Sequence, residues 1–286
     1  MQTECSVPEG WNWDSTLFKG SAAYYSRGRM PYAPGFAEVL AEALALDGRG
    51  VLLDVGCGPG TVILQLASYF EEAVGMDPDE DMLAEARRRA GELGVGNVRW
   101  IQAMAEDLPL GLGPIRVAMF AQSFHWTDRD KVASAVFDML IPGGKFVHMS
   151  DRKGPLVNPL QLPHPAPPVA DIEELAAQYL GNERRAGQGV LRKGTPNQED
   201  VVLARAGFTN KERLIVPGNV VIDRSPDDIV AWTFSVSKTA PHLFGSRVED
   251  FERDLRTLLH RTSPEDVFSE QVRDTEIWIW TKPAES

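Results

Sequence analysis

Apolar runs alternate with glycine-bearing turns in the first half of the chain. The run Val51–Val55 is largely apolar on consecutive positions, which is typical of a parallel strand buried on both faces. The segment Thr61–Tyr69 predicts a helix, and Ala73–Met76 predicts a second strand that ends at Asp77. This order of strand, turn, helix and strand indicates an α/β sheet.

The same alternation continues as far as residue 151. Ile115–Phe120 predicts a further strand, and residues 135–148 predict a helix, a Pro-Gly-Gly stop and another strand. From Asp151 to Pro168 the chain is rich in proline and glycine, and the periodic signal stops. We interpret that segment as a linker or loop.

The second half of the chain predicts shorter elements separated by polar segments. Residues 182–196 are polar and contain glycines, as mobile surface loops do. We expect helices and strands over the following ranges: helices at Asp171–Leu180, Gln198–Ala206, Pro226–Ser235 and Val248–His260, and strands at Arg213–Val216 and Glu276–Thr281.

Length and composition indicate a soluble enzyme and exclude several other classes. A chain of 286 residues is long enough for one catalytic domain with an appended lid. The net charge of −12 argues against a nucleic-acid partner, and the basic triplet Arg87–Arg89 lies between glutamates, as on a solvated helix face. We find no apolar run of 18 residues, so we expect no membrane partner.

Cysteine and histidine usage points away from disulfide and metal chemistry. Only Cys5 and Cys57 are present, which predicts a reduced, cytoplasmic setting. No His, Asp and Glu cluster has convincing metal-ligand spacing, so we expect no required metal.

The turn after the first strand carries the chemistry. Gly56, Gly58 and Gly60 stand at alternate positions, where glycine lets the backbone turn sharply and a ligand approach closely. The next helix points its unpaired N–H groups back at this turn, and these favour a carboxylate or phosphate. Asp77 can accept both hydroxyls of a ribose. A nicotinamide fingerprint would need a glycine where Thr61 stands, which weakens that alternative.

These residues resemble motif I of the class I S-adenosylmethionine-dependent methyltransferases. The pattern D-x-G-x-G-x-G matches Asp54 to Gly60 without a gap, and an acid ends the second strand, as in that family. The resemblance is close for residues 24–151 and implies a seven-stranded, Rossmann-like three-layer α/β sandwich with helical lid insertions. It also implies that S-adenosyl-L-methionine is the cofactor and S-adenosyl-L-homocysteine the product. It implies cofactor-binding residues in and after this loop, namely Asp54, Gly56, Cys57, Gly58, Gly60, Asp77, Pro78 and Met82.

Two further segments resemble the same family. Residues 98–109 resemble its third strand and adenine-contacting loop, which implies contacts from Ala105 and Glu106. Ala103 and Met104 replace the usual Gly-Asp, so a carboxylate contact to the adenine must come from Glu106 or Asp107, or be absent. Residues 121–126, which include Gln122 as a cofactor contact, resemble the loop after strand four in the trans-aconitate methyltransferase-like group.

The N-terminal 35 residues are unusually aromatic, so we expect something to bury them. Residues 23–32 resemble a segment that closes over the cofactor in that group, with Tyr25 and Arg29 as contacts. A guanidinium binds a carboxylate bidentately, which makes Arg29 a candidate partner of the methionine carboxylate; a surface salt bridge is the alternative. We therefore predict an N-terminal lid segment at 1–35, a cofactor-binding core at 36–150, and the rest of the sheet with lid insertions at 151–286. The lid itself takes in 1–35, 151–196 and 220–262.

Methyl transfer from a sulfonium is an in-line displacement and needs mainly positioning. His125 is the leading candidate for a general base, because it follows strand four on the rim where ligands bind. A structural role beside Trp126 is the alternative, and His148 and His242 are weaker candidate bases. We expect the acceptor-binding residues to be Trp13, Tyr24, Trp126, His148 and Trp232, with core packing as the alternative for both Trp126 and Trp232.

The sequence therefore predicts transfer of a methyl group to an oxygen, nitrogen or carbon of a small molecule. The resemblance extends to enzymes of secondary metabolism, but a fold-level analogy does not fix a substrate. Alternatives are a cofactor-binding protein without methyl transfer, such as a cyclase or binding module, and a nicotinamide-dependent oxidoreductase. The acidic charge disfavours a macromolecular acceptor, and we expect a monomer or homodimer.

Overall fold

The computed structural model describes residues 16–181, 185–186, 189–190 and 199–284. The predicted acceptor contact Trp13 and most of the segment 182–196 lie outside these residues. None of the helices in the described part of the chain is long and apolar enough to span a membrane.

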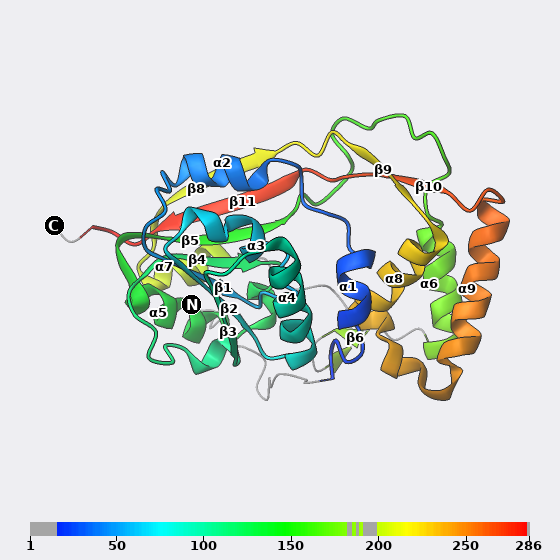
Figure 1. The fold of residues 1–286 in the computed structure, drawn as a ribbon, viewed down its shortest axis with the longest axis horizontal. Coiled ribbons are helices and arrows are strands. Elements are labelled where there is room, and N and C mark those ends of the chain that lie inside the picture. Colours follow the sequence, from blue (N-terminus) through cyan, green and yellow to red (C-terminus); the bar gives the residue numbers. More distant parts are fainter. Residues whose placement is uncertain (1–15, 182–184, 187–188, 191–198, 285–286) are drawn as a thin grey trace, which may run out of the picture.

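A seven-stranded sheet in the order β3-β2-β1-β4-β5-β11-β8 forms the core, which confirms the predicted fold class (Figure 1). The first five strands in this order are parallel, and β11 runs antiparallel to both β5 and β8. The strands have these bounds: β1 Val51–Val55, β2 Glu72–Asp77, β3 Val98–Gln102, β4 Ile115–Ala121, β5 Leu140–Asp151, β8 Thr209–Val216 and β11 Thr275–Thr281.

Apolar side chains on both faces of the sheet explain why its central strands read as continuous apolar runs. Leu52 and Leu53 are both fully buried, but they belong to different cores because successive strand residues point to opposite faces. One core packs under α2 and α3, and the other under α5 and α7. The helices of the sheet domain have these bounds: α2 Phe36–Ala43, α3 Ile63–Leu66, α4 Glu80–Leu93, α5 Arg129–Met139 and α7 Glu199–Ala206.

Two local predictions differ from the structure. The helix expected over 61–69 is only the short α3, followed by a 3-10 turn at Ala67–Tyr69. Its first residues, Thr61 to Ile63, are β-branched and lower the helix propensity. Strand β5 begins at Leu140, ahead of the expected Pro-Gly-Gly stop, and its pairing with β4 shifts register there.

The segments outside the sheet form a second, helical lobe with its own core (Figure 1). The rings of Phe234, Phe244 and Phe251 contact one another in this core, and Phe268 is fully buried in it. A two-stranded antiparallel sheet, β9 with β10, connects the lobe to the main sheet, and the sequence did not predict it. The elements of the lobe have these bounds: α1 Ala22–Gly28, α6 Val169–Leu180, β9 Val221–Arg224, α8 Pro226–Ser235, α9 Val248–Thr262 and β10 Phe268–Gln271.

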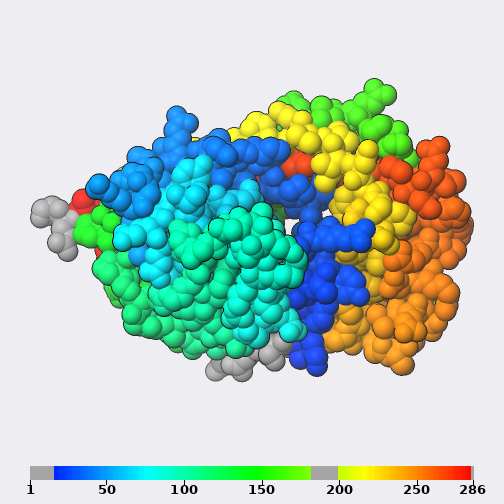
Figure 2. Space-filling model, in the orientation of Figure 1, coloured from blue at the N-terminus to red at the C-terminus, as the bar shows by residue number. Residues whose placement is uncertain are grey.

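Helix α1 lies between the sheet domain and the helical lobe (Figure 2). A Cβ atom on Gly28 would lie 2.3 Å from the backbone carbon of Ala231, so only glycine allows α1 to lie this close to α8. Arg224 donates hydrogen bonds to the carbonyls of Gly28 and Asp228, which ties the end of α1 to α8. The chain that leaves α1 therefore enters the space above the sheet at a fixed place.

Candidate functional site

Two adjoining cavities lie at the carboxyl ends of the parallel strands. The larger has a volume of about 520 Å³ and the smaller about 100 Å³. They meet at shared lining residues from α1, the glycine turn and the end of β4, namely Tyr25, Gly56, Gly58, Ala121 and Gln122. Ligands of open α/β sheets bind at this edge.

The glycine turn forms the floor of both cavities. Gly56 and Gly58 have positive φ angles of 70° and 52°, which L-residues rarely adopt. A Cβ on Gly56 would meet the Ser123 side chain at 2.6 Å, whereas one on Gly58 would find no atom within 4 Å. Gly58 therefore faces open space. Gly60 lines neither cavity; its Cα packs close to Leu64 and Trp100.

Asp77 connects the end of β2 to the glycine turn. One carboxylate oxygen accepts a hydrogen bond from the Gly58 N–H at 2.8 Å, and the other accepts one from Asp79 at 2.9 Å. Burial raises the pKa of the Asp77 carboxyl to about 6, although these two bonds lower it in part. Its side chain lines the smaller cavity, as the prediction of a ribose contact requires.

Of two neighbouring carboxylates at the far end of the smaller cavity, one lines the cavity and the other does not. Asp107 accepts a hydrogen bond from the backbone N–H of Met104 at 3.0 Å and does not line the cavity. Glu106 does line it, and one of its oxygens accepts a hydrogen bond from Asp128 N–H at 2.6 Å. Of the two carboxylates that the sequence offered for an adenine contact, only Glu106 lines the cavity. Pro78, Met82 and Ala105, which were also expected to contact the cofactor, line the same cavity.

Two buried charged groups in the larger cavity have polar atoms without partners. Asp54 is 1% exposed, and among the described residues neither of its carboxylate oxygens has a hydrogen-bond partner. Burial, and then the charge of Asp77, raise its pKa to about 7, while the nearby backbone of Ile63 lowers it in part. The buried Nε of Arg29 also has no partner in the described part of the chain. Such groups are costly unless a ligand satisfies them.

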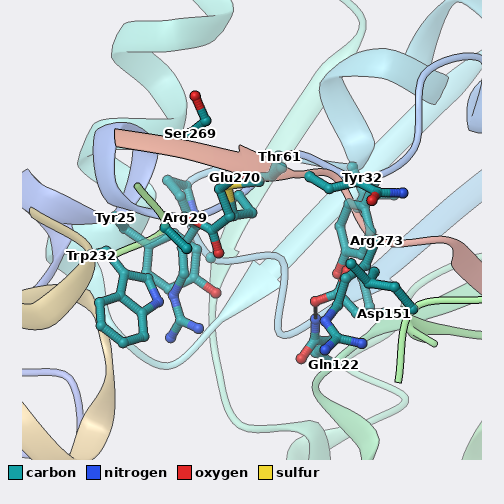
Figure 3. A pocket seen from close by; sticks show the side chains of 18 of the residues that line it. Tyr25, Arg29, Tyr32, Thr61, Gln122, Asp151, Trp232, Ser269, Glu270 and Arg273 are labelled. Carbon is teal, nitrogen blue, oxygen red and sulfur yellow. Dashed lines mark hydrogen bonds between the residues drawn. The ribbon is translucent and has the colours of Figure 1, made fainter. Parts of the chain in front are cut away.

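Arg29 is held from two sides. Its Nη2 donates to the carbonyl of Ser235 at 2.9 Å, and its guanidinium lies 4.8 Å from the centre of the Tyr25 ring. Among the described residues it forms no ion pair, so the surface salt bridge considered as an alternative is not formed. Figure 3 shows Tyr25, Arg29 and Trp232 together on one side of the larger cavity.

The remaining predicted residues are divided between the cavities and the protein core. Trp232 lines the larger cavity, but Trp126 lines the smaller one, at the cofactor side. Tyr24 lines neither and packs on Phe234 with ring centres 5.1 Å apart. Cys57 lines the larger cavity, and burial raises the pKa of its thiol well above the ordinary value, which keeps it protonated.

The structure does not bring the predicted histidines to either cavity. The His125 ring lies 4.8 Å from that of Trp126, and His148 faces the α5 and α7 side of the sheet with Phe146. Burial, and then nearby positive charges from His148, Lys153 and Arg129, lower the pKa of His125 to about 4. An imidazole with this pKa is a weak proton acceptor at neutral pH.

Several lining residues of the larger cavity were not among the predicted site residues. Asp151 ends β5 at the same sheet edge as Gln122, and this edge position was a signal available in the sequence. Glu270 and Arg273 come from β10 and the residues just after it, which no pattern predicted. Leu156, Leu160 and Leu162 come from the expected linker.

Comparisons with known proteins decide the family. Residues 52–144 match the family model described as a methyltransferase domain. An uncharacterized methyltransferase of Mycobacterium tuberculosis, Rv3342, is 30% identical over 243 residues, which cover 85% of this chain and 86% of that protein. The chain belongs to the class I S-adenosylmethionine-dependent methyltransferases.

Other relatives of this methyltransferase agree. The probable S-adenosylmethionine-dependent methyltransferase CRG1 of Saccharomyces cerevisiae is 33% identical over 101 residues, but these span only 34% of either protein. The ubiquinone/menaquinone biosynthesis C-methyltransferase UbiE of Vibrio campbellii is 27% identical over 182 residues, which cover 59% of this chain and 68% of UbiE. The solved structure of YcgJ from Bacillus subtilis has a TM-score of 0.51 at 18% identity, covers 87% of this chain and 98% of its own, and shows the same fold.

The residues of this methyltransferase fit S-adenosylmethionine. The smaller cavity offers a carboxylate and apolar walls suited to a nucleoside, and the larger one offers an unpartnered carboxylate and an unpartnered guanidinium N–H suited to a zwitterionic amino acid. The cofactor is therefore S-adenosylmethionine, as the resemblance to class I methyltransferases implied. Among the described residues, no group of three or more His, Cys, Asp or Glu could hold a metal ion.

Proposed function

We propose that this methyltransferase transfers a methyl group to a small-molecule acceptor bound in the larger cavity. The observation that carries the proposal is the junction of the two cavities at Gly56, Gly58 and Gln122. A cavity of about 520 Å³ has the size of a small-molecule site, and it opens directly beside the place where the cofactor's reactive end would lie. The resemblance to UbiE, whose name gives a small-molecule pathway, supports this acceptor class.

Four charged residues have roles in holding the cofactor in this proposal. Asp77 binds the ribose hydroxyls and Glu106 lies at the adenine end, because both line the smaller cavity. Asp54 binds the ammonium group of the methionine part, and Arg29 binds its carboxylate through the free Nε. These contacts would persist with S-adenosylhomocysteine, since the product keeps all of these groups.

The chemistry needs little more than positioning. S-adenosylmethionine supplies an electrophilic methyl carbon on a sulfonium. The protein holds the acceptor in line with that carbon at about 3–3.5 Å, and this arrangement supplies much of the rate acceleration. Tyr25 and Trp232 from the helical lobe, and the leucines of residues 156–162, cover the larger cavity and exclude water.

The finer assignment to the trans-aconitate methyltransferase-like group rests on residues 23–32 and 121–126. In this chain the first of these segments forms part of α1 and supplies Tyr25 and Arg29 to the larger cavity, and the second supplies Gln122. We therefore propose that the chain belongs to the trans-aconitate methyltransferase-like group. Membership of this group identifies neither the acceptor nor a role in secondary metabolism.

A cofactor-binding protein without methyl transfer is the alternative to test. The experiment incubates the protein with S-adenosylmethionine carrying a tritiated methyl group and a pool of small molecules freed of protein and nucleic acid. We expect the label to move to a small molecule that gains one methylene in mass. Cofactor binding without any transfer, across pools from several sources, would contradict the proposal.

Binding variants test the cofactor roles separately. Asp77→Ala should weaken S-adenosylmethionine by about 1–3 kcal/mol, the usual cost of losing hydrogen bonds to a charged group. Gly58→Val should weaken it more, because the new side chain would project into the open space where the cofactor lies. Asp138→Asn, which changes an exposed carboxylate on α5, is the control. Calorimetry that found the control's affinity in both variants would overturn the assignment.

A further inference from the structure

Gln122 lies where the two cavities meet, and its side chain forms a hydrogen bond with a residue of the larger cavity. It follows β4 directly and has a positive φ of 53°, which a residue other than glycine adopts only at some energetic cost. Its backbone N–H donates to the Met149 carbonyl at 2.9 Å, and its side-chain amide donates to Asp151 Oδ2 at 3.0 Å. The strained backbone therefore turns the Gln122 side chain toward β5 (Figure 3).

Asp151 is the carboxylate next to this junction on the acceptor side. It ends β5, pairs with Thr275 of β11, and lines only the larger cavity. Gln122 holds one of its oxygens, and within the described residues the other oxygen, Oδ1, has no hydrogen-bond partner. Since Gln122 borders both cavities, an acceptor atom that contacts Asp151 also lies near the cofactor's methyl group.

The other titratable groups of the larger cavity are committed elsewhere. Glu270 pairs with the buried Arg224 at 3.0 Å. Burial raises the pKa of Tyr32 well above its ordinary value, and Gln122 lowers it only in part, so the phenol stays protonated. Asp54 faces the amino-acid part of the cofactor in the proposed binding mode. Asp151 is left as the carboxylate available to an acceptor.

The walls of the acceptor space define the chemistry of its ligand. Leu156, Leu160, Leu162 and Trp232 form an apolar side. Arg273 donates through Nη1 to the carbonyls of Arg152 and Gly154, so this part of its guanidinium holds the backbone of the covering segment. Burial raises the pKa of the Asp151 carboxyl, whereas the Gln122 hydrogen bond and the charges of Arg273 and Arg29 lower it in part. Arg29 binds the methionine carboxylate in the proposed binding mode, and the carboxylates of Asp151 and Glu270 would repel an anionic acceptor. A neutral molecule with an apolar body and one O–H or N–H group fits better.

We propose that Asp151, held by Gln122, accepts the proton of a neutral hydroxyl or N–H group on an apolar acceptor; this inference rests on the proposed function. The acceptor's proton moves to Asp151 as the lone pair of its oxygen or nitrogen forms the bond to the methyl carbon. The carbon–sulfur bond breaks, and its electron pair stays on sulfur to give neutral S-adenosylhomocysteine. Charge balances, because the sulfonium and the carboxylate are neutralised together, and the proton then passes from Asp151 to water.

The first experiment measures which ligands bind the protein saturated with S-adenosylhomocysteine. The probes are 4-alkylphenols, 4-alkylanilines and 4-alkylbenzoates with matched chains, and ligand-observed NMR gives their affinities. We expect the phenol or the aniline to bind at least about tenfold more tightly than the benzoate. Equal or tighter binding of the benzoate overturns the inference, and so does the failure of every neutral probe to bind a protein that binds S-adenosylhomocysteine normally.

The second experiment measures single-turnover methyl transfer to the probe that binds most tightly. Asp151→Asn keeps the size of the side chain and should lower the rate by about 10²–10⁴-fold, the usual contribution of a general base. The wild-type rate should rise with pH as Asp151 loses its proton, and the variant should lose this dependence. Gln122→Asn tolerates the same backbone but shortens the reach to Asp151, and should lower the rate less. Asp138→Asn is the control.

The outcomes separate this inference from the proposed function. Transfer that Asp151→Asn leaves at the wild-type rate, with the same pH profile, overturns the role of Asp151 and keeps the small-molecule methyltransferase. A total absence of transfer to any small molecule, in the wild type and in the variants alike, overturns both. The affinity of Asp151→Asn for S-adenosylmethionine, which should stay within about twofold of the wild type because Asp151 lines only the larger cavity, shows whether its loss of rate reflects misfolding.

Discussion

At the scale of single residues, the site is defined by buried charges that the protein leaves unsatisfied. Within the described residues, Asp54 and Arg29 both have polar atoms without partners in the same cavity, whereas Arg224 and Glu270 nearby form an ion pair. A folded protein tolerates such unpaired groups at the cost of stability, and a ligand with the complementary charges recovers that cost on binding. The arrangement therefore favours a ligand that carries both an ammonium and a carboxylate group over a ligand without charged groups.

A pH dependence of cofactor binding follows from Asp54. Its pKa of about 7 in the ligand-free protein is raised, so the carboxylate that would bind the ammonium group forms only as the pH rises through that value. Affinity for S-adenosylmethionine should fall as the pH drops below about 7, by up to about tenfold per pH unit. Calorimetry at a series of pH values checks this, and Asp54→Asn should bind weakly with a much flatter profile. A wild-type affinity that is constant from pH 8 to about pH 5.5 would exclude the ammonium contact.

His125→Ala tests the base expected from the sequence. If His125 accepts the proton, the variant should lose about 10²–10⁴-fold in turnover. The position of His125 away from both cavities and its lowered pKa of about 4 lead us to expect a loss of less than about tenfold. Single-turnover rates of His125→Ala and Asp151→Asn, measured side by side with the same acceptor, decide between the two residues. A large loss in His125→Ala with unchanged cofactor affinity would restore it as the base.

At the scale of elements, the close packing of α1 on α8 positions the cofactor and acceptor residues. Helix α1 carries Tyr25, and Arg29 follows at its end, while Trp232 lies in α8. Ser21 Oγ also donates to the Phe234 carbonyl at 2.8 Å, which fixes the start of α1. The two helices therefore act as one unit in placing the aromatic and cationic side chains over the sheet.

Gly28→Ala should separate these two helices. The added Cβ would lie 2.3 Å from backbone atoms of α8, so backbone has to move, and overpacking of this kind costs about 1–3 kcal/mol of stability. Gly91→Ala in α4 is the matched control, because its Cβ would meet nothing within 4 Å and alanine favours a helix. The free energy of unfolding, measured by chemical denaturation, and the affinity for S-adenosylmethionine should both be lower in Gly28→Ala and unchanged or higher in Gly91→Ala. Equal stability of the two variants would show that the packing of α1 on α8 is loose.

At the scale of the whole molecule, the sheet domain and the helical lobe meet around the site. The sheet domain supplies the glycine turn and the cofactor carboxylates, and the helical lobe supplies the cover. The covering segment 152–168 and the chain between α1 and α2 have few regular hydrogen bonds, as do many segments that close over active sites. Binding of both ligands is expected to order them.

Hydrogen exchange tests this closure. Amides in residues 16–35 and 152–168 should exchange more slowly once S-adenosylhomocysteine and an acceptor are bound, because closing segments shield the reaction from water. The lid expected from the sequence also includes 1–15 and 182–196, where we predict the same protection, but residues 1–15 and most of 182–196 lie outside the described part of the structure. Strand β1, already buried, serves as the internal control. Identical exchange with and without ligands would exclude a gating role.

The sequence by itself determined the sheet, its glycine turn and the cofactor. These features depend on residues close together in the chain: the apolar run of Val51–Val55, the glycines that follow it, and Asp77 at the end of the next strand. Local spacing sets backbone conformation and strand burial directly, so a short segment carries the information.

Only the tertiary structure decided which side chains line the larger cavity together. Trp232 was expected from the sequence as an acceptor contact, whereas Asp151 and Glu270 were not. The three residues come from elements far apart in the chain, and no periodicity indicates that they share a cavity. Because of the same packing, Trp126 lines the smaller cavity, Tyr24 packs in the core of the lobe, and His125 lines neither cavity. A side chain acquires such a role from the long-range packing of sheet and lobe, which no segment of the sequence specifies alone.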